Sequence, residues 1–155
     1  HADPAVALAA YRRALDLAMD ARNGRLEGLA RREIVGVQMA ALEPRELAEE
    51  LIGIFGHLRR IVDTGNVYLC LSYTSELLIG SGDAEGAALL HGHGRRGWSG
   101  RSGGGRRERE VFEAAGRTAM GERWDVLVAR GAASNVTQIV DLACERLTQV
   151  RDLEE

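Results

Sequence analysis

Apolar residues recur at intervals of three and four along most of this chain, and this period constrains the fold more than any other feature. The pattern runs from residue 4 to about residue 95, and again from about residue 106 to residue 152. It is the spacing of one face of an α-helix. Aromatic residues make up only 5% of the chain, so the core must come mainly from Leu, Ala, Val and Ile, which suits packed helices. Because 155 residues is the length of one domain, we predict a single all-α domain over residues 1–155.

Turn and breaker residues divide the periodic segments into about eight helices. Breaks should fall at Asn23-Gly24, Glu43-Pro44, Thr64-Gly65 and Gly80-Ser81-Gly82, because Gly, Pro and Asn favour turns. The predicted helices cover residues 4–21, 25–42, 44–63, 66–79, 83 to about 94, 106–119, 121–130 and 134–152. The segment YLCLSY, residues 68–73, is the best strand candidate. It has no partner strand, and we keep it in a helix.

Residues 94–105 interrupt the helical pattern. They contain six glycines and no apolar period, and such a composition is typical of flexible segments. We therefore predict a flexible Gly/Arg loop over residues 96–105. It would separate a repeat region over residues 1–95 from C-terminal capping helices over residues 106–155.

The same region is locally basic. The window from Arg95 to Arg109 holds six arginines against Glu108 alone, in a chain whose net charge is −3. A nucleic-acid-binding domain is usually basic overall, so the window indicates a local basic loop. It also contains Trp98, whose ring could stack on a base or on a partner's side chain, or fold back on an apolar patch of its own chain.

Small residues recur at a spacing that predicts stacked helical hairpins. Ala7, Ala48 and Ala87 are separated by 41 and 39 residues, and the last two follow a small residue about twelve positions upstream, Gly36 and Ser75. Each alanine would open the second helix of a hairpin. Small side chains at these points let two antiparallel helices approach closely, as a stacked repeat requires.

This pattern resembles the tetratricopeptide repeat. The segment ALAAYRRALDLA matches the second helix of that repeat, with Ala7, Tyr11 and Ala14 on its small, aromatic and small positions. The match weakens where Ile52 and His91 replace the usual aromatic residue. The resemblance implies antiparallel helical hairpins stacked as a right-handed solenoid. A period near 40 residues, longer than the usual 34, is typical of the repeat regions of large bacterial signalling ATPases.

The C-terminal third resembles the segment that closes those same proteins. RREREVFEAAGRTAMGERWDVLVARGAASNVTQIVDLACERL carries the matching landmarks Met120-Gly121-Glu122, Trp124, Gly131 and Ser134. The resemblance implies the C-terminal repeat region of an actinobacterial-type signal-transduction ATPase or transcriptional regulator, LuxR-like or cyclase-linked. The full-length protein would add a nucleotide-binding module and a DNA-binding or cyclase output. Because the chain opens at His1 and not at Met, we expect a piece of a longer protein.

The chain lacks the residues that several kinds of catalytic and binding site need. The chain has twenty arginines and no lysine, which excludes lysine Schiff bases, P-loop lysines and lysine general bases. His91 and His93 alone do not complete a zinc or haem site, so we expect solvated loop histidines. The segment around Asp83 lacks the ending of a phosphate loop, and Asp83 is interpreted as a helix cap. We predict no enzyme, no cofactor and no metal site.

Cysteine usage and hydropathy indicate a cytoplasmic protein. Cys70 and Cys144 lie far apart in apolar helical patterns, without a CxxC motif or a signal sequence. Two reduced, buried cysteines are the expected arrangement. No apolar run approaches the length of about 18 residues that suggests a membrane span.

The predicted function is therefore binding. The first helices of the hairpins would line a concave groove with Glu33, Val37, Ser72 and Glu76. We expect a non-catalytic regulatory module that binds a protein partner or an intramolecular segment there. One alternative is a small-molecule sensor, and a second is nucleic-acid contact through residues 95–109, including Trp98. The outer face of the first helix, left without a partner, is a candidate for homodimer contacts.

Overall fold

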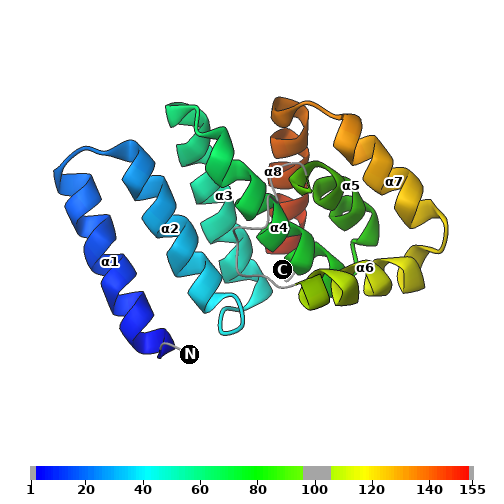
Figure 1. The fold of residues 1–155 in the computed structure, drawn as a ribbon, viewed down its shortest axis with the longest axis horizontal. Helices are drawn as coiled ribbons and strands as arrows, with labels where there is room; N and C mark the ends of the chain where they lie inside the picture. Colours follow the sequence, from blue (N-terminus) through cyan, green and yellow to red (C-terminus); the bar gives the residue numbers. More distant parts are fainter. Residues whose placement is uncertain (1–2, 96–105, 154–155) are drawn as a thin grey trace.

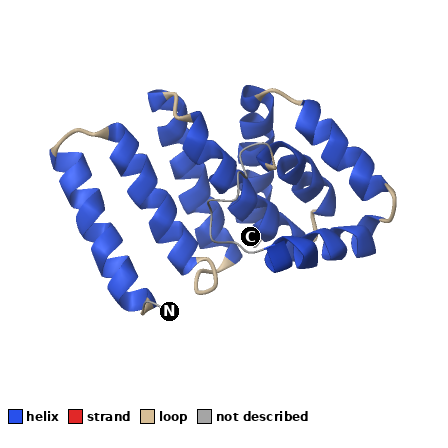
Figure 2. Ribbon diagram, in the orientation of Figure 1, coloured by secondary structure: helices blue, strands red, loops and turns tan. Residues whose placement is uncertain are grey.

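The computed structural model describes residues 3–95 and 106–153, and all of its regular structure is helical. Figure 2 shows helices joined by short loops, with no strand in those two ranges. The predicted all-α class is therefore confirmed. The predicted flexible loop over residues 96–105, with Trp98, lies outside the described residues. The helices are α1 (Pro4–Asp20), α2 (Gly24–Gln38), α3 (Pro44–Ile61), α4 (Thr64–Gly80), α5 (Ala84–Gly94), α6 (Arg106–Met120), α7 (Arg123–Ala133) and α8 (Val136–Asp152).

Side-chain caps fix most of the helix starts. Asp3, Asn23, Asp63 and Asp83 each accept a hydrogen bond from a backbone N–H in the first turn of the helix that follows. Asn135 does the same for α8, and Gln138 returns a bond to the Asn135 N–H, which makes a capping box. These bonds satisfy N–H groups that have no partner inside the helix.

The predicted helix bounds agree with the structure to within three residues, except at the end of α2. That helix was expected to reach Leu42 but ends at Gln38. Glu43 has an extended backbone, with ψ near 152°, because a residue before proline is pushed out of the helical region. The intervening residues form a turn that leads into Pro44.

The helices from α1 to α5 pack in chain order, but the remaining helices do not continue the array. Helix α7 packs on α5, and α6 contacts both α5 and α7. Helix α8 then returns to the middle of the molecule and packs on α3, α4 and α5 (Figure 1). A stack in which each hairpin touches only its neighbours would keep α8 beside α7, so α8 departs from the predicted solenoid.

The close contacts predicted at small residues are found in part, since Ala7 in α1 is only half-buried. Ala48 in α3 and Ala87 in α5 are completely buried. At Gly36 in α2, an added Cβ would lie 2.6 Å from the Tyr73 hydroxyl oxygen of α4. This contact joins α2 to α4 and not to α3, the helix predicted to form a hairpin with α2.

Among the glycines that the structure describes, the closest contacts with a facing backbone join α5 and α7, and the sequence argument did not foresee them. A Cβ on Gly92 would lie 2.0 Å from the Val128 carbonyl oxygen, and one on Gly131 would lie 1.9 Å from the Leu89 carbonyl oxygen. No side chain fits at these distances, so the two backbones touch. Helix α5 continues through Gly92 to Gly94, close to the end predicted from the sequence.

Candidate functional site

The four groove residues predicted from the sequence lie on α2 and α4 but differ in exposure. Glu33 and Val37 are half-buried on α2, and Glu33 pairs with the neighbouring Arg32. Glu76 on α4 is exposed, whereas Ser72 is buried with 8% of its surface exposed. Ser72 therefore offers little of its side chain to a partner.

Polar contacts between α2 and α4 hold this face together. Arg32 donates a hydrogen bond to the Asn66 side chain, whose own amide donates to Asp63. Burial, reinforced by the charges of Glu33 and Glu76, raises the pKa of Tyr73 to about 12. The Tyr73 phenol is therefore neutral at physiological pH, and both predicted carboxylates lie close enough to act on it.

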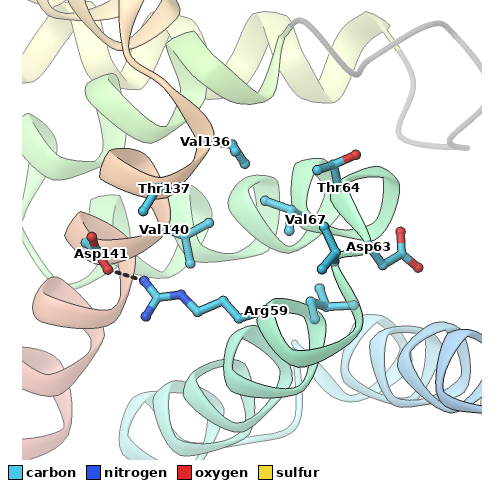
Figure 3. Close-up of a pocket in the computed structure, with 10 residues that line it drawn as sticks. Arg59, Asp63, Thr64, Val67, Val136, Thr137, Val140 and Asp141 are labelled. Atoms are coloured by element: carbon cyan, nitrogen blue, oxygen red, sulfur yellow. Dashed lines mark hydrogen bonds and ion pairs between the residues drawn. The ribbon is translucent and has the colours of Figure 1, made fainter.

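A pocket of about 300 Å³ lies elsewhere, where α8 returns to the ends of α3 and α4. Figure 3 shows its lining side chains converging from these three helices. We call it the α3/α4/α8 pocket. Its apolar lining consists of Leu58, Val62, Val67, Val136 and Val140, and its polar lining of Arg59, Asp63, Thr64, Thr137 and Asp141.

An ion pair crosses one side of this pocket. Arg59 of α3 extends toward α8 and donates a hydrogen bond to the Asp141 carboxylate (Figure 3). Both side chains are largely exposed, and an exposed pair of this kind contributes only about 0–1 kcal/mol. A bound partner could therefore rearrange the pair at little cost.

Val62 at the rim of the pocket has an unusual backbone. Its φ is 54° in the left-handed region, and its side chain is 81% exposed. Glycine or asparagine usually ends a helix in this way, because a β-branched side chain is strained there. An exposed, strained valine at a pocket rim costs stability without burying apolar surface in the folded chain.

A second, more polar pocket of about 250 Å³ lies between α2 and α3. Its lining includes Glu27, Arg31, Glu49 and Glu50 around the buried His57. The His57 Nε2 lies 2.7 Å from the Gly24 carbonyl oxygen, and its Nδ1 lies 3.4 Å from a Glu27 carboxylate oxygen. These contacts give His57 a structural role between the two helices.

The expectation of solvated histidines at positions 91 and 93 is wrong. Both lie inside α5 and are buried, with 4% and 2% of their surfaces exposed. The His91 ring packs against Phe112 and Trp124, and the His93 ring stacks on Tyr68 at 5.6 Å. The reason is tertiary, because α6 and α7 pack over His91 and Tyr68 of α4 packs on His93.

His91 also bonds to a carboxylate. Its Nε2 lies 3.1 Å from a Glu113 carboxylate oxygen of α6. Burial lowers the pKa of His91 and outweighs the opposite effect of Glu113. A neutral His91 therefore donates its ring N–H to Glu113 and joins α5 to α6.

The cysteines are free thiols. Cys70 is buried, as expected, and Cys144 is only half-buried. Burial raises the pKa of the Cys70 thiol to about 12 and also raises that of Cys144. Both thiols are therefore protonated at neutral pH, and a protonated thiol is a poor nucleophile.

The described residues contain no group of three or more His, Cys, Asp or Glu side chains that could hold a metal ion. Likewise, none of the helices described is long and apolar enough to cross a membrane. Of the basic window, the structure describes the side chains of Arg95 and Arg109. Arg95 lies 3.9 Å from Glu113, so part of its charge is balanced within the fold.

Sequence reasoning did not identify the α3/α4/α8 pocket. It forms only because α8 returns to α3, which brings together Arg59 and Asp141, 82 residues apart. The sequence contained only a weak indication of this pocket. Val136 and Val140, one helical turn apart, mark an apolar face at the start of α8, but nothing in the sequence says which helix that face meets.

In comparisons with known proteins, no family model, no curated protein and no solved structure matched this chain. Its function must therefore be argued from the geometry of its own residues.

Proposed function

We propose that this chain is a non-catalytic interaction module that binds a partner segment through the α3/α4/α8 pocket. The observation that carries the proposal is an apolar pocket of about 300 Å³ with an ionic rim. An apolar side chain of a partner would enter it, and the exposed Arg59 and Asp141 would meet polar groups beside that anchor. Interfaces commonly combine an apolar anchor with a polar rim in this way.

Val62 supports the same proposal. A strained residue whose side chain is exposed contributes little to folding, and such residues cluster at functional sites. Contact with a partner would bury the Val62 side chain and recover apolar surface. The proposed role is regulatory, in line with the resemblance to cytoplasmic signal-transduction ATPases and transcriptional regulators.

The predicted groove on α2 and α4 extends this proposal as a secondary contact surface. Glu33 and Glu76 lie near the neutral Tyr73 phenol, so this face presents carboxylates beside a hydrogen-bonding hydroxyl. A segment anchored in the pocket and carrying basic residues would complement them.

Peptide selection tests the proposal. A random peptide library is panned on the immobilised chain, with counter-selection on Val136→Phe, which fills the pocket with its own apolar ring. We expect enriched peptides that share an apolar anchor and bind Val136→Phe at least about tenfold more weakly, as measured by fluorescence polarisation. Val126→Phe is the matched control, because Val126 is an exposed valine on α7 and does not line the pocket.

Equal binding of the enriched peptides to Val136→Phe and to the wild type would contradict the proposal, as would a library that yields no binder. Circular dichroism and thermal unfolding establish that both variants fold. Glu33→Gln and Glu76→Gln then test the secondary surface, where a small loss of affinity for basic peptides is expected.

A small-molecule sensor is the second candidate, and the pocket volume favours it. About 300 Å³ is at the lower end of the range for ligand sites. A thermal-shift screen with small apolar fragments distinguishes the two functions. A fragment that stabilises the wild type but not Val136→Phe, in a chain that selects no peptide, would favour the sensor.

Nucleic-acid contact through residues 95–109 is the third candidate. It predicts salt-sensitive binding that is lost when the arginines become serine. A chain that produces no mobility shift on DNA or RNA at low salt would exclude it.

A further inference from the structure

The α3/α4/α8 pocket is large for one aliphatic side chain. The apolar residues that the structure describes around it are all aliphatic, namely Leu58, Val62, Val67, Val136 and Val140. Its volume is about 300 Å³, whereas a cavity of about 150 Å³ in a protein interior is large enough to bind benzene. A leucine would leave much of this space unfilled, and unfilled space forfeits packing contacts. The pocket therefore has room for a bicyclic ring.

Arg59 places a guanidinium beside this aliphatic lining. It donates a hydrogen bond to the Asp141 carboxylate along one side of the pocket (Figure 3). A guanidinium forms such bonds through its edge, so its flat faces stay available to stack on an aromatic ring. The bond to Asp141 also holds the group in position, so less conformational freedom is lost when a ring stacks on it. The rim therefore favours an aromatic anchor over an aliphatic one.

The polar lining favours an anchor that donates a hydrogen bond. Thr64, Thr137 and Asp141 carry side-chain oxygens that accept hydrogen bonds. Among the described side chains of the lining, Arg59 alone is purely a donor, and it is engaged with Asp141. Tryptophan combines a bicyclic ring with a single N–H donor, and its ring attracts a guanidinium more strongly than that of tyrosine or phenylalanine.

The charge around the pocket indicates what lies beside the anchor. Asp63 and Asp141 contribute two carboxylates to the lining, and Arg59 contributes one guanidinium, so the lining has an excess of negative charge. The Asp141 side chain is 61% exposed, so a cation of a partner can approach it from solvent. A basic residue next to the anchor would complement this rim, whereas an acidic one would be repelled.

We propose that the partner of the α3/α4/α8 pocket is a peptide segment that inserts a tryptophan side chain and carries an arginine or lysine beside it. This inference rests on the proposed function, because it names what the partner places in that pocket. The indole ring fills the aliphatic pocket and stacks on Arg59, and its N–H donates to an oxygen of the lining. Tryptophan is among the residues that most often dominate the binding energy of protein interfaces.

Three focused peptide libraries test the anchor. Each library fixes its central residue as tryptophan, phenylalanine or leucine and randomises the neighbouring positions. Each is panned on the immobilised chain, with counter-selection on Val136→Phe. We expect the tryptophan library to enrich most, with arginine or lysine at the flanking positions. In fluorescence polarisation, the enriched peptides should bind at least about tenfold more tightly than the same peptides with leucine in place of tryptophan.

Variants of the rim separate stacking from charge. Arg59→Met keeps an apolar stem but removes the guanidinium, so it should weaken the tryptophan peptides about fivefold and the leucine peptides much less. Arg60→Met is the matched control, because Arg60 is exposed on α3 and does not line this pocket. Asp141→Asn should weaken peptides with a basic flank about threefold. Asp125→Asn, in the exposed ion pair with Arg117, should not, and circular dichroism establishes that each variant is folded.

The outcomes distinguish this inference from the function on which it rests. Leucine or phenylalanine peptides that bind as tightly as the tryptophan peptides would overturn the tryptophan anchor while the pocket remains a peptide site. An Arg59→Met variant that binds every peptide as the wild type does, or enriched peptides with acidic flanks, would overturn it as well. Failure of all three libraries, or equal binding to Val136→Phe and the wild type, would overturn the proposed function itself. A chain that binds free indole but no peptide would assign the pocket to a small molecule and overturn both.

Discussion

Val62 combines a strained backbone with an exposed side chain at the proposed binding site. Its left-handed backbone, with φ of 54°, is one that β-branched side chains avoid. Glycine adopts this conformation without strain. The valine is therefore better explained by what its exposed side chain can contact than by the folding of α3.

We expect Val62→Gly to raise the free energy of unfolding by about 1 kcal/mol, because it removes the left-handed strain. The same variant should bind pocket-selected peptides more weakly, because part of the rim is lost. Urea unfolding and fluorescence polarisation measure the two effects. A destabilised Val62→Gly would mean that the valine stabilises the fold, and unchanged peptide affinity would remove Val62 from the site.

His91 makes the fold sensitive to acid. Burial lowers the pKa of His91, so the unfolded chain binds a proton more readily than the folded chain below the ordinary value of 6.5. Burial alone would raise the pKa of Glu113, but the hydrogen bond from His91 and the nearby positive charges lower it. A carboxylate with a lowered pKa also loses its stabilising contribution as the pH falls.

Stability should therefore fall as the pH drops through and below 6.5. His91→Gln keeps an N–H donor toward Glu113 but cannot take up a proton, and it should flatten this dependence. The measurement is the thermal unfolding midpoint of both proteins at neutral pH and at about pH 5.5, below the model-peptide pKa of histidine. Parallel pH profiles for wild type and variant would show that another group is responsible.

At the scale of elements, two glycines determine how α5 and α7 meet. Added Cβ atoms at Gly92 or Gly131 would fall about 2 Å from backbone carbonyl oxygens of the facing helix. Backbone atoms cannot move aside as a flexible side chain can, so the helices would have to separate. This separation would also disturb the covering of His91 by Trp124.

Gly131→Ala should destabilise the protein by about 3 kcal/mol, because overpacking at a backbone contact displaces a whole helix. Gly53→Ala is the matched control. Gly53 lies inside α3, and an added Cβ there meets nothing within 4 Å, so its higher helix propensity should stabilise the protein by up to about 1 kcal/mol. Chemical denaturation of both variants checks the contrast. If Gly131→Ala changes the free energy of unfolding no more than Gly53→Ala does, or leaves it unchanged, α7 lies further from α5 than this contact requires.

At the scale of the whole molecule, α8 ties the middle of the array together. It packs on α3, α4 and α5 and buries Ile139, Ala143 and Leu147 among them. Helix α1, in contrast, packs on α2 and buries only Ala18 in the described chain. Local stability follows the number of buried apolar contacts, so it should differ between the two ends.

Hydrogen exchange should therefore show the least protected amides in α1 and the most protected in α3, α5 and α8. Leu147→Ala should cost about 2–5 kcal/mol and lower protection in α3 and α5 as well as in α8, because the three helices share one core. Exchange monitored by mass spectrometry gives the protection of each helix. Loss of protection confined to α8 would show that it unfolds as an independent unit.

Local features of the fold could be predicted from the sequence because their causes are local. The apolar period indicated the helices, and Asp83 caps α5 as its position suggested. Ala48 and Ala87 are buried where close helix approach was expected. The candidate site was harder to predict from the sequence. The predicted groove residues are spread over α2 and α4 and line neither of the two pockets described above.

The sequence by itself determined the helical class, most of the helix bounds and the small residues that permit close packing, because each depends on neighbours within a few positions. Only the tertiary structure decided that α8 returns to α3, that His91 and His93 are covered, and that Arg59 meets Asp141 across the α3/α4/α8 pocket. An apolar helix face needs to be buried, but its pattern does not specify which distant face will bury it. That choice is made by the packing of the whole chain.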